Sequence, residues 1–351
     1  MKRDFCHLTS ETVPFSEYEI AANDIEEDYN DFVLGVHSHV EVEKKSSCGQ
    51  RLPELTPLMA NSYPTHHWPW HAAIYYNNKD YHPFPFYRCG GTVINSNTVL
   101  TAAHCVSRFN EPMQSNEFLV SLGRLNLDVD ESSGQNFTVA EVIIHPDFEY
   151  FDKNNDIAIL RLSTHATFNN YVQPICMWPS NKKKFSEIVD RAGTVVGWGK
   201  KETGEISHIL QEASIPVVSF FTCLSSNRTF YGNFLTEKNY CAGNRNGISV
   251  NPGDGGGSMT FEEGGIYYIR GLVSKCLANN QNGMCDSMEY SIFTDVAQYL
   301  SWIEEVIAKR PFSALPILTR RFLFLNTPNT KKKSMMATIL SFVLLVLRTE
   351  R

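Results

Sequence analysis

The chain has 351 residues and a formal net charge of −7, so it is long enough for one sizeable domain or two smaller ones with an ample core. The acidic balance gives no support for a nucleic-acid-binding surface. Nine cysteines without a CxxC spacing disfavour a zinc site and favour disulfides, which form in an oxidising compartment.

The first 47 residues are polar and acidic and show little periodicity. This composition predicts a solvated, disordered segment. No apolar run follows Lys2 and Arg3, so the start of the chain is not that of a signal peptide. We therefore expect the natural N-terminus to lie outside this sequence.

From Cys48 onward the composition shifts to short apolar runs separated by Gly, Asn, Pro and Ser clusters. Such runs predict many short strands, and hence an all-β barrel or sandwich. Near the end of this region, residues 294–307 place Val296, Leu300, Ile303 and Ile307 at helical spacing, which predicts one amphipathic helix. The clearest strand candidates are residues 72–76, 118–122, 139–144, 157–162 and 266–273.

Beyond Arg310 the chain is basic and apolar, and three lysines at 331–333 precede an apolar run over 335–347. This run has 13 residues, whereas a bilayer-spanning helix needs about 20. The pattern is typical of the start of a signal peptide. Our hypothesis is a gene-model fusion or read-through, and the alternative is a weak membrane-surface anchor.

Two glycosylation sequons begin at Asn136 and Asn227. N-linked glycans occur on surface segments of secreted proteins. Together with the cysteines they predict an extracellular glycoprotein.

The glycine-rich stretch 252–259 reads PGDGGGSM. Its glycines allow a tight turn that presents backbone N–H groups, as an oxyanion hole requires. Upstream lie a histidine in the block AAHC, His104, and an aspartate in the block DIA, Asp156. The order His, Asp, glycine turn is that of one type of acyl-transfer triad. Further motifs are WPW at 68–70, CGGTVI at 89–94, GWG at 197–199 and GLVS at 271–274.

In this order the motifs resemble the chymotrypsin/trypsin-like serine endopeptidases over roughly residues 48–308, and the chain looks closest to arthropod secreted immune-cascade proteases and serine protease homologues. The resemblance implies an all-β fold of two six-stranded antiparallel β-barrels with a C-terminal α-helix. Composition and resemblance together divide the chain into four segments: an acidic N-terminal segment at 1–47, a light-chain-like linker at 48–57, the protease domain at 58–310 and a basic and apolar tail at 311–351.

The resemblance implies that His104 is the general base and Asp156 the acid that orients it, with an oxyanion hole from the backbone N–H groups of Gly253 and Gly255. The family pattern GDSGG reads GDGGG here, so Gly255 stands where the nucleophilic serine belongs. Ser258 lies three residues later, and this shift moves it several ångströms beyond reach of the base.

The expected substrate pocket differs from that of trypsin-like members. Ser249 stands where an aspartate would select Lys or Arg, so trypsin-like specificity is not supported. Ser274, Lys275 and Cys276 replace Ser-Trp-Gly, and Ser291 replaces a glycine that opens the pocket.

The resemblance assigns Asp254 as the acid that would pair with a new amino terminus after activation. The corresponding segment at 58–62 reads LMANS, and Pro57 precedes it. The usual cleavage point therefore has no Lys or Arg.

The resemblance also implies three disulfides: Cys89 with Cys105, Cys223 with Cys241, and Cys48 with Cys176. Asn251 occupies the position of one expected cysteine, whose partner would be Cys285. A bridge between Cys276 and Cys285 is one alternative for that residue. Cys6 would then be free or paired with another chain.

Three functions remain open. The leading hypothesis is a secreted, catalytically inactive serine protease homologue in a proteolytic immune cascade, without cofactor or metal, whose protein partners are active proteases or their substrates. The alternative is an active serine endopeptidase, which would require another nucleophile or an erroneous residue 255. The third is a decaying gene copy. Fold alone does not choose among them.

Overall fold

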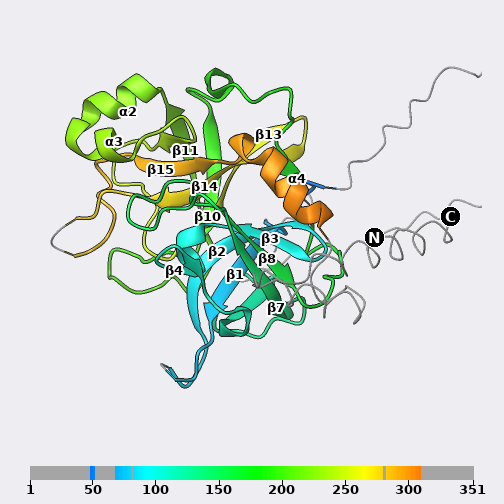
Figure 1. Ribbon diagram of the computed structural model, residues 1–351. Helices are drawn as coiled ribbons and strands as arrows, with labels where there is room; N and C mark the ends of the chain where they lie inside the picture. The colour runs from blue at the N-terminus through cyan, green and yellow to red at the C-terminus, as the bar shows by residue number, and fades with distance from the viewer. Residues whose placement is uncertain (1–47, 52–67, 81, 280–281, 310–351) are drawn as a thin grey trace, which may run out of the picture. The chain divides into compact units, whose positions relative to one another are not determined.

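Two barrels of antiparallel strands form the part of the chain that the structure, a computed structural model, describes: residues 48–51, 68–80, 82–279 and 282–309 (Figure 1). The predicted acidic segment, the expected activation segment around Met59 and the apolar run at 335–347 lie outside these residues.

The N-terminal barrel is closed, with the strand order β1-β2-β3-β8-β7-β6. Its inward side chains come from alternate positions, as in β7, where Phe137 and Val139 are buried while their neighbours Asn136 and Thr138 are exposed. A short hairpin, β4-β5, leaves the barrel after β3. The strands are β1 (His71–Tyr76), β2 (Phe86–Asn95), β3 (Thr98–Thr101), β4 (Ser107–Arg108), β5 (Glu111–Pro112), β6 (Phe118–Leu122), β7 (Gln135–Ile144) and β8 (Ala158–Leu162).

The C-terminal barrel has the order β13-β10-β11-β12-β15-β14 and closes through pairing of β13 with β14. A seventh strand, β9, adds to β14 in parallel. The two closed barrels confirm the expected fold class. The strands are β9 (Cys176–Met177), β10 (Ala192–Gly197), β11 (Gln211–Val218), β12 (Asn239–Ala242), β13 (Ser258–Glu263), β14 (Ile266–Lys275) and β15 (Ser291–Asp295).

Each barrel has its own apolar core, and a third buried cluster joins them. In this joining cluster Leu100 of β3 and Ile159 of β8 pack with Ile269 and Leu272 of β14 and with Ile303. Burial of apolar area contributes roughly 25 cal/mol per Å². The interface between the barrels is therefore part of the hydrophobic core.

The C-terminal helix is shorter than predicted. α4 (Leu300–Ala308) begins after a 3-10 turn, η4 (Val296–Gln298), whereas residues 294 and 295 end strand β15. Asp295 explains the change, because its side chain accepts the N–H of Ala297 and caps η4. The buried face of α4 consists of Leu300, Ile303 and Val306. The prediction that Ile307 belongs to the apolar face was wrong, because this residue is 38% exposed.

Two further helices, which the sequence pattern did not reveal, follow β11: α2 (Phe220–Ser226) and α3 (Arg228–Phe234). Ser219 caps α2 and Asn227 caps α3 through side-chain oxygens that accept backbone N–H groups. The remaining 3-10 turns are η1 (Ala103–Cys105), η2 (Ser115–Glu117) and η3 (Phe185–Glu187).

Four disulfides are formed among the described cysteines. The three pairs that the resemblance implied are present, and Cys276 is bonded to Cys285. The last pair settles the alternative left open by the sequence. In the chain-entropy model, a bond that closes a loop of about 15 residues contributes roughly 3 kcal/mol.

Within the described ranges, no helix combines the length and apolar character needed to cross a membrane.

Candidate functional site

His104 and Asp156 lie next to the ends of two neighbouring strands of the N-terminal barrel. His104 lies in η1, just after β3, and Asp156 precedes β8, which pairs with β3. Thr101 at the end of β3 is paired with Ala158 near the start of β8. This register places the two side chains together although 52 residues separate them.

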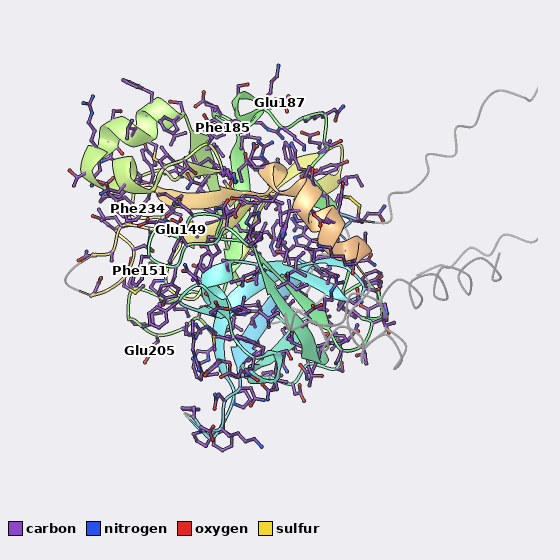
Figure 2. The ribbon with its side chains drawn as sticks, in the orientation of Figure 1. Glu149, Phe151, Phe185, Glu187, Glu205 and Phe234 are labelled. Carbon is purple, nitrogen blue, oxygen red and sulfur yellow. A yellow bond between two sulfur atoms is a disulfide. The ribbon has the colours of Figure 1, made fainter. Side chains whose placement is uncertain are left out.

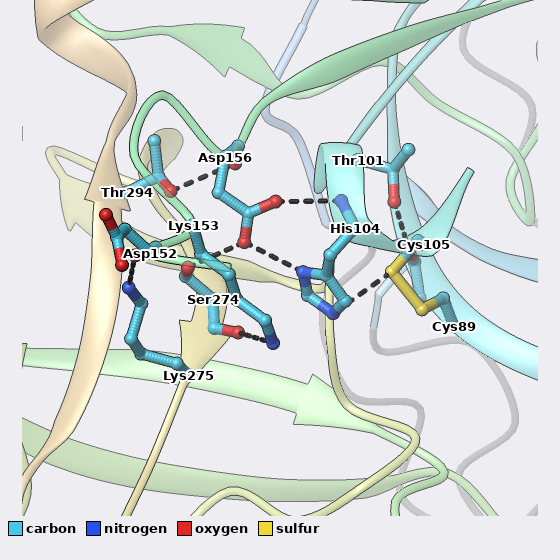
Figure 3. A network of polar contacts seen from close by, with 11 residues as sticks. Cys89, Thr101, His104, Cys105, Asp152, Lys153, Asp156, Ser274, Lys275 and Thr294 are labelled. Carbon is cyan, nitrogen blue, oxygen red and sulfur yellow. Dashed lines mark hydrogen bonds and ion pairs between the residues drawn. A yellow bond between two sulfur atoms is a disulfide. The ribbon is translucent and has the colours of Figure 1, made fainter. Parts of the chain in front are cut away.

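Asp156 is 1% exposed and holds His104 at two points. Its Oδ1 accepts the backbone N–H of His104 at 2.9 Å, and its Oδ2 lies 2.7 Å from Nδ1 of the imidazole (Figure 3). Ser274 donates its hydroxyl to the same Oδ2 at 2.6 Å, and Thr294 donates to the Asp156 backbone carbonyl at 3.0 Å. The imidazole orientation is therefore fixed from both barrels.

Burial and charge act in opposite directions on this pair. Burial alone would raise the pKa of Asp156, but attraction to His104 and the hydrogen bonds it accepts lower that pKa below its ordinary value. Burial lowers the pKa of His104, although Asp156 favours its protonation. At neutral pH the pair is thus a carboxylate beside a neutral imidazole. Its Nδ1 donates to Asp156, and its Nε2, which lies 3.6 Å from Sγ of Cys105, can accept a proton.

The turn at 253–257 lies directly in front of this imidazole. A Cβ atom on Gly255 would lie only 2.7 Å from Nε2 of His104, so the backbone of Gly255 approaches the ring very closely. Gly256 has a φ of +75°, and a Cβ there would lie 2.1 Å from Oγ1 of Thr101. Only glycine fits that position. The turn is held by Gly90, whose N–H donates to the carbonyl of Gly255 at 2.9 Å.

The N–H groups of Gly253 and Gly255 have no hydrogen-bond acceptor among the described residues. Both residues line the cleft that also contains His104. Tyr87 donates its hydroxyl to the carbonyl of Gly253 at 2.8 Å and so fixes that peptide group. The two N–H groups are therefore available to an oxygen atom of a bound molecule.

Asp254 points away from the cleft into the C-terminal barrel. Its carboxylate accepts the N–H groups of Gly199 and Asn251, each at 2.8 Å. Burial raises its pKa to about 6, although these two hydrogen bonds act in the opposite direction. Within the described ranges Asp254 forms no ion pair.

The cleft beside His104 is a cavity of about 360 Å³. Three of the five predicted pocket residues, Ser274, Lys275 and Cys276, line it. Ser249 instead lines a separate cavity of about 300 Å³ together with Asp254. Ser291 is 2% exposed, and its hydroxyl lies 3.3 Å from that of Ser249.

Ser258 does not share this cleft. It begins β13 opposite Leu272, is 0% exposed and does not line the cavity that contains His104. Its hydroxyl has no hydrogen-bond partner among the described residues.

Two cationic residues of the cleft were missed by the sequence reasoning, Lys153 and Arg88. Lys153 donates to the carbonyl of Ser274 at 3.3 Å, and Arg88 donates to the carbonyl of Cys105 at 2.6 Å. Their sequence positions gave only a weak indication that they lie at the site: Lys153 lies three residues before Asp156, and Arg88 directly precedes Cys89. Only the fold shows that both side chains face the cleft.

Cys89, His104 and Cys105 have potential metal-ligating atoms within 4.8 Å of one another. The two sulfurs are joined to each other in a disulfide, however. Metal ligation by cysteine needs a thiolate, so we assign no metal to this group.

The two sequon asparagines differ in their surroundings. Asn136 on β7 is exposed. Asn227 is half-buried and caps α3 through its side-chain oxygen, which accepts the N–H of Phe230 at 3.1 Å.

Known proteins share the sequence pattern of this chain. The trypsin family model matches residues 59–303. The chain is 32% identical over 273 residues to serine protease gd of Drosophila melanogaster, which covers 67% of this chain and 50% of that protein. It is 33% identical to chymotrypsin-like elastase family member 1 of Felis catus, over 69% of this chain and 85% of that protein.

A third relative is Limulus clotting factor C of Carcinoscorpius rotundicauda, 31% identical over 74% of this chain. The chain spans half of the length of the Drosophila protein and 26% of the clotting factor. The matched region includes both barrels, the pair of His104 and Asp156 and the glycine turn. The chain therefore belongs to the trypsin family of serine proteases.

Proposed function

We propose that this protein is a catalytically inactive serine protease homologue that serves as a secreted binding or regulatory component. The observation that carries the proposal is the position of Gly255. Its backbone lies against Nε2 of His104, in the place where a trypsin-family enzyme needs a hydroxyl group.

The chemical consequence is direct. In acyl transfer the base removes a proton from a hydroxyl, whose oxygen then attacks the substrate carbonyl. Gly255 has no side chain, so His104 has no nucleophile to activate. Loss of the serine alone lowers turnover about 10⁶-fold in a related mechanism. The free N–H groups of Gly253 and Gly255 would support at most slow attack by water.

Three features support a binding role for the remaining scaffold. The cleft is present as a cavity, the orientation of His104 is fixed by Asp156, and two disulfides, Cys89–Cys105 and Cys276–Cys285, line the cleft. Disulfides and sequons favour an extracellular glycoprotein. We expect the partners to be proteins, namely active proteases or their substrates in a proteolytic cascade of innate immunity. One relative is named a clotting factor.

The test is labelling of the full, disulfide-intact chain with a fluorophosphonate probe that reacts with activated serines. We expect no labelling of the natural chain and clear labelling of the Gly255→Ser variant. A Cβ at this position would lie 2.7 Å from Nε2, closer than van der Waals contact allows, so the imidazole has to shift before a side chain fits there. We therefore expect slow labelling rather than full reactivity.

The matched control is the double variant Gly255→Ser with His104→Ala, which keeps the hydroxyl but lacks the base and should not label. Labelling of the natural chain, or cleavage of a mixed peptide library by it, would contradict the proposal.

The second candidate is an active endopeptidase, which the intact pair of His104 and Asp156 favours. It requires another nucleophile. The candidate in the sequence, Ser258, is buried and lies outside the cleft. A natural chain that labels, and loses the label in a Ser258→Ala variant, would establish it.

A further inference from the structure

The cleft beside His104 is lined by cationic side chains and by no acidic one. Lys153, Lys275 and Arg88 line the cavity, and its 15 described lining residues include no Asp or Glu. The carboxylate of Asp156 acts on both lysines, and its Oδ2 is bonded to His104 and Ser274. Three cationic side chains therefore line the cleft beside the single ionised carboxylate of Asp156, which leaves the cleft with a net positive charge.

The two lysines are positioned by neutral groups. Lys153 donates to the carbonyl of Ser274 at 3.3 Å, and Lys275 donates to the backbone carbonyl of Asp152 (Figure 3). The Nζ of Lys275 also lies 4.3 Å from the ring centroid of Phe234, the last residue of α3, which is labelled in Figure 2. An ammonium group has three donors, so each lysine keeps donors for a bound molecule.

Neither lysine forms an ion pair with a carboxylate in the part of the chain that the structure describes. Burial lowers the pKa of Lys153. Burial, together with the charge of Lys153, lowers the pKa of Lys275 to about 8. Asp156 and Asp152 act in the opposite direction. A partly buried cation without a directly paired carboxylate is unfavourable, and a ligand carboxylate in contact with it would relieve that cost.

The other donors of the cleft suit a polypeptide. The N–H groups of Gly253 and Gly255 are without acceptors among the described residues, so they can bind a carbonyl or carboxylate oxygen. Arg88 lines both this cavity and a second one of about 580 Å³, which contains Tyr76, Phe86 and Tyr150. The second cavity shares only Arg88 with the cleft, and its aromatic lining offers room for an apolar side chain.

We propose that the cleft beside His104 binds an acidic segment of a partner protein, whose carboxylates pair with Lys153 and Lys275. The inference rests on the proposed function, since it names the chemistry of the partner that the inactive cleft retains.

The probes are fluorescein-labelled octapeptides that alternate Glu and Ala or, as the matched neutral version, Gln and Ala, all with amidated C-termini. Binding to the full chain is measured by fluorescence anisotropy. We expect the Glu peptide to bind at least tenfold more tightly than the Gln peptide. A charge-assisted hydrogen bond is strengthened in such a partly buried site, and the preference should shrink in 0.5 M salt, where exposed charges are screened.

The double variant that carries Lys153→Gln and Lys275→Gln should lose the preference for the Glu peptide. The double variant that carries Lys153→Arg and Lys275→Arg should retain it. The control pair Lys183→Gln with Lys184→Gln changes net charge equally outside the cleft and should leave it intact. Circular dichroism of each variant shows that it is folded. Equal binding of the Glu and Gln peptides to the natural chain would overturn the proposal, and so would a preference that survives Lys153→Gln with Lys275→Gln.

A third probe, the Gln peptide with a free C-terminal carboxylate, distinguishes the source of the carboxylate. A lysine-dependent gain for this probe alone would assign a chain terminus and overturn the proposal of acidic side chains. Mass spectrometry of each peptide after incubation separates the two proposals: cleaved peptide contradicts the inactive cleft, whereas intact peptide without a Glu preference contradicts only the acidic partner.

Discussion

The imidazole of His71 is buried at a point where the two barrels meet. Its ring lies 5.0 Å from that of Trp198, and a Cβ on Gly90 or Gly257 would contact its Cε1. Neither ring nitrogen has a hydrogen-bond partner among the described residues. Burial lowers its pKa to about 3, so the folded protein holds this histidine neutral.

Because of His71, we expect the stability of the protein to fall at acid pH. The folded pKa of this histidine, about 3, lies below the unfolded value of 6.5, so the unfolded state binds a proton first as pH falls. The free energy of unfolding therefore has its full value above about pH 6.5 and falls progressively as the pH is lowered toward 3. Between pH 7.5 and pH 5 the natural chain should lose about 2 kcal/mol more stability than a His71→Phe variant.

Urea unfolding at both pH values measures this difference. His145→Phe serves as a control, because that histidine is less enclosed. If the natural chain and His71→Phe show parallel pH profiles, His71 has a partner or remains hydrated in solution.

Gly255 is the residue on which the proposed inactivity rests. The turn needs glycine at Gly256 for backbone geometry, but Gly255 has a φ outside the left-handed region. Serine is therefore compatible with the backbone there. A serine side chain there would meet the closely approaching imidazole of His104, which is why the labelling of Gly255→Ser is expected to be slow.

Strand β14 is joined to β15 and the start of η4 by a buried ion pair. Arg270 donates to both carboxylate oxygens of Asp295, at 2.7 and 3.0 Å, and it also donates to the carbonyls of Lys182 and Lys183. The side chains of Arg270 and Asp295 are 0% and 3% exposed. Removing one partner would leave an uncompensated buried charge.

An Arg270→Met variant should therefore lose about 3–5 kcal/mol in its free energy of unfolding, as measured by urea denaturation. Adding Asp295→Leu should recover part of this loss, because the isolated carboxylate is then removed. As a control, Arg191→Met breaks a partly exposed pair with Glu263, which should change stability by less than about 1 kcal/mol. Similar losses for Arg270→Met and Arg191→Met would contradict the argument.

At the scale of the whole molecule, the two barrels share a core. The joining cluster contains Leu100 from the N-terminal barrel and Ile269 from the C-terminal barrel, both 0% exposed. Asp156 of one barrel is likewise bonded to Ser274 and Thr294 of the other. Unfolding of one barrel would expose the apolar surface of its partner, so the two should unfold together.

A Leu100→Ala variant should lose about 2–5 kcal/mol and still unfold in one transition, with tryptophan fluorescence and far-ultraviolet circular dichroism giving the same midpoint. Val120→Ala, in the core of the N-terminal barrel, is the control for a loss confined to one barrel. Two separated transitions in the natural chain would show that the barrels are independent.

The sequence by itself predicted an all-β barrel or sandwich, several of its strands and the order of the motifs, because short apolar runs and glycine turns are local properties of the chain. The two barrels were implied by the family resemblance, which also placed three disulfides. The sequence pattern missed α2 and α3, whose stability comes from caps at Ser219 and Asn227 and from packing around Cys223 and Tyr231, and it extended the last helix into β15.

The tertiary structure alone decided which residues share the cleft. Lys153 and Lys275 are 122 residues apart, and only closure of the two barrels places them beside His104. It also showed that Ser249 lines a different cavity and that Cys276 is bonded to Cys285. The physical reason is the same in each case: a contact between distant residues depends on strand register and barrel closure, which no local pattern contains.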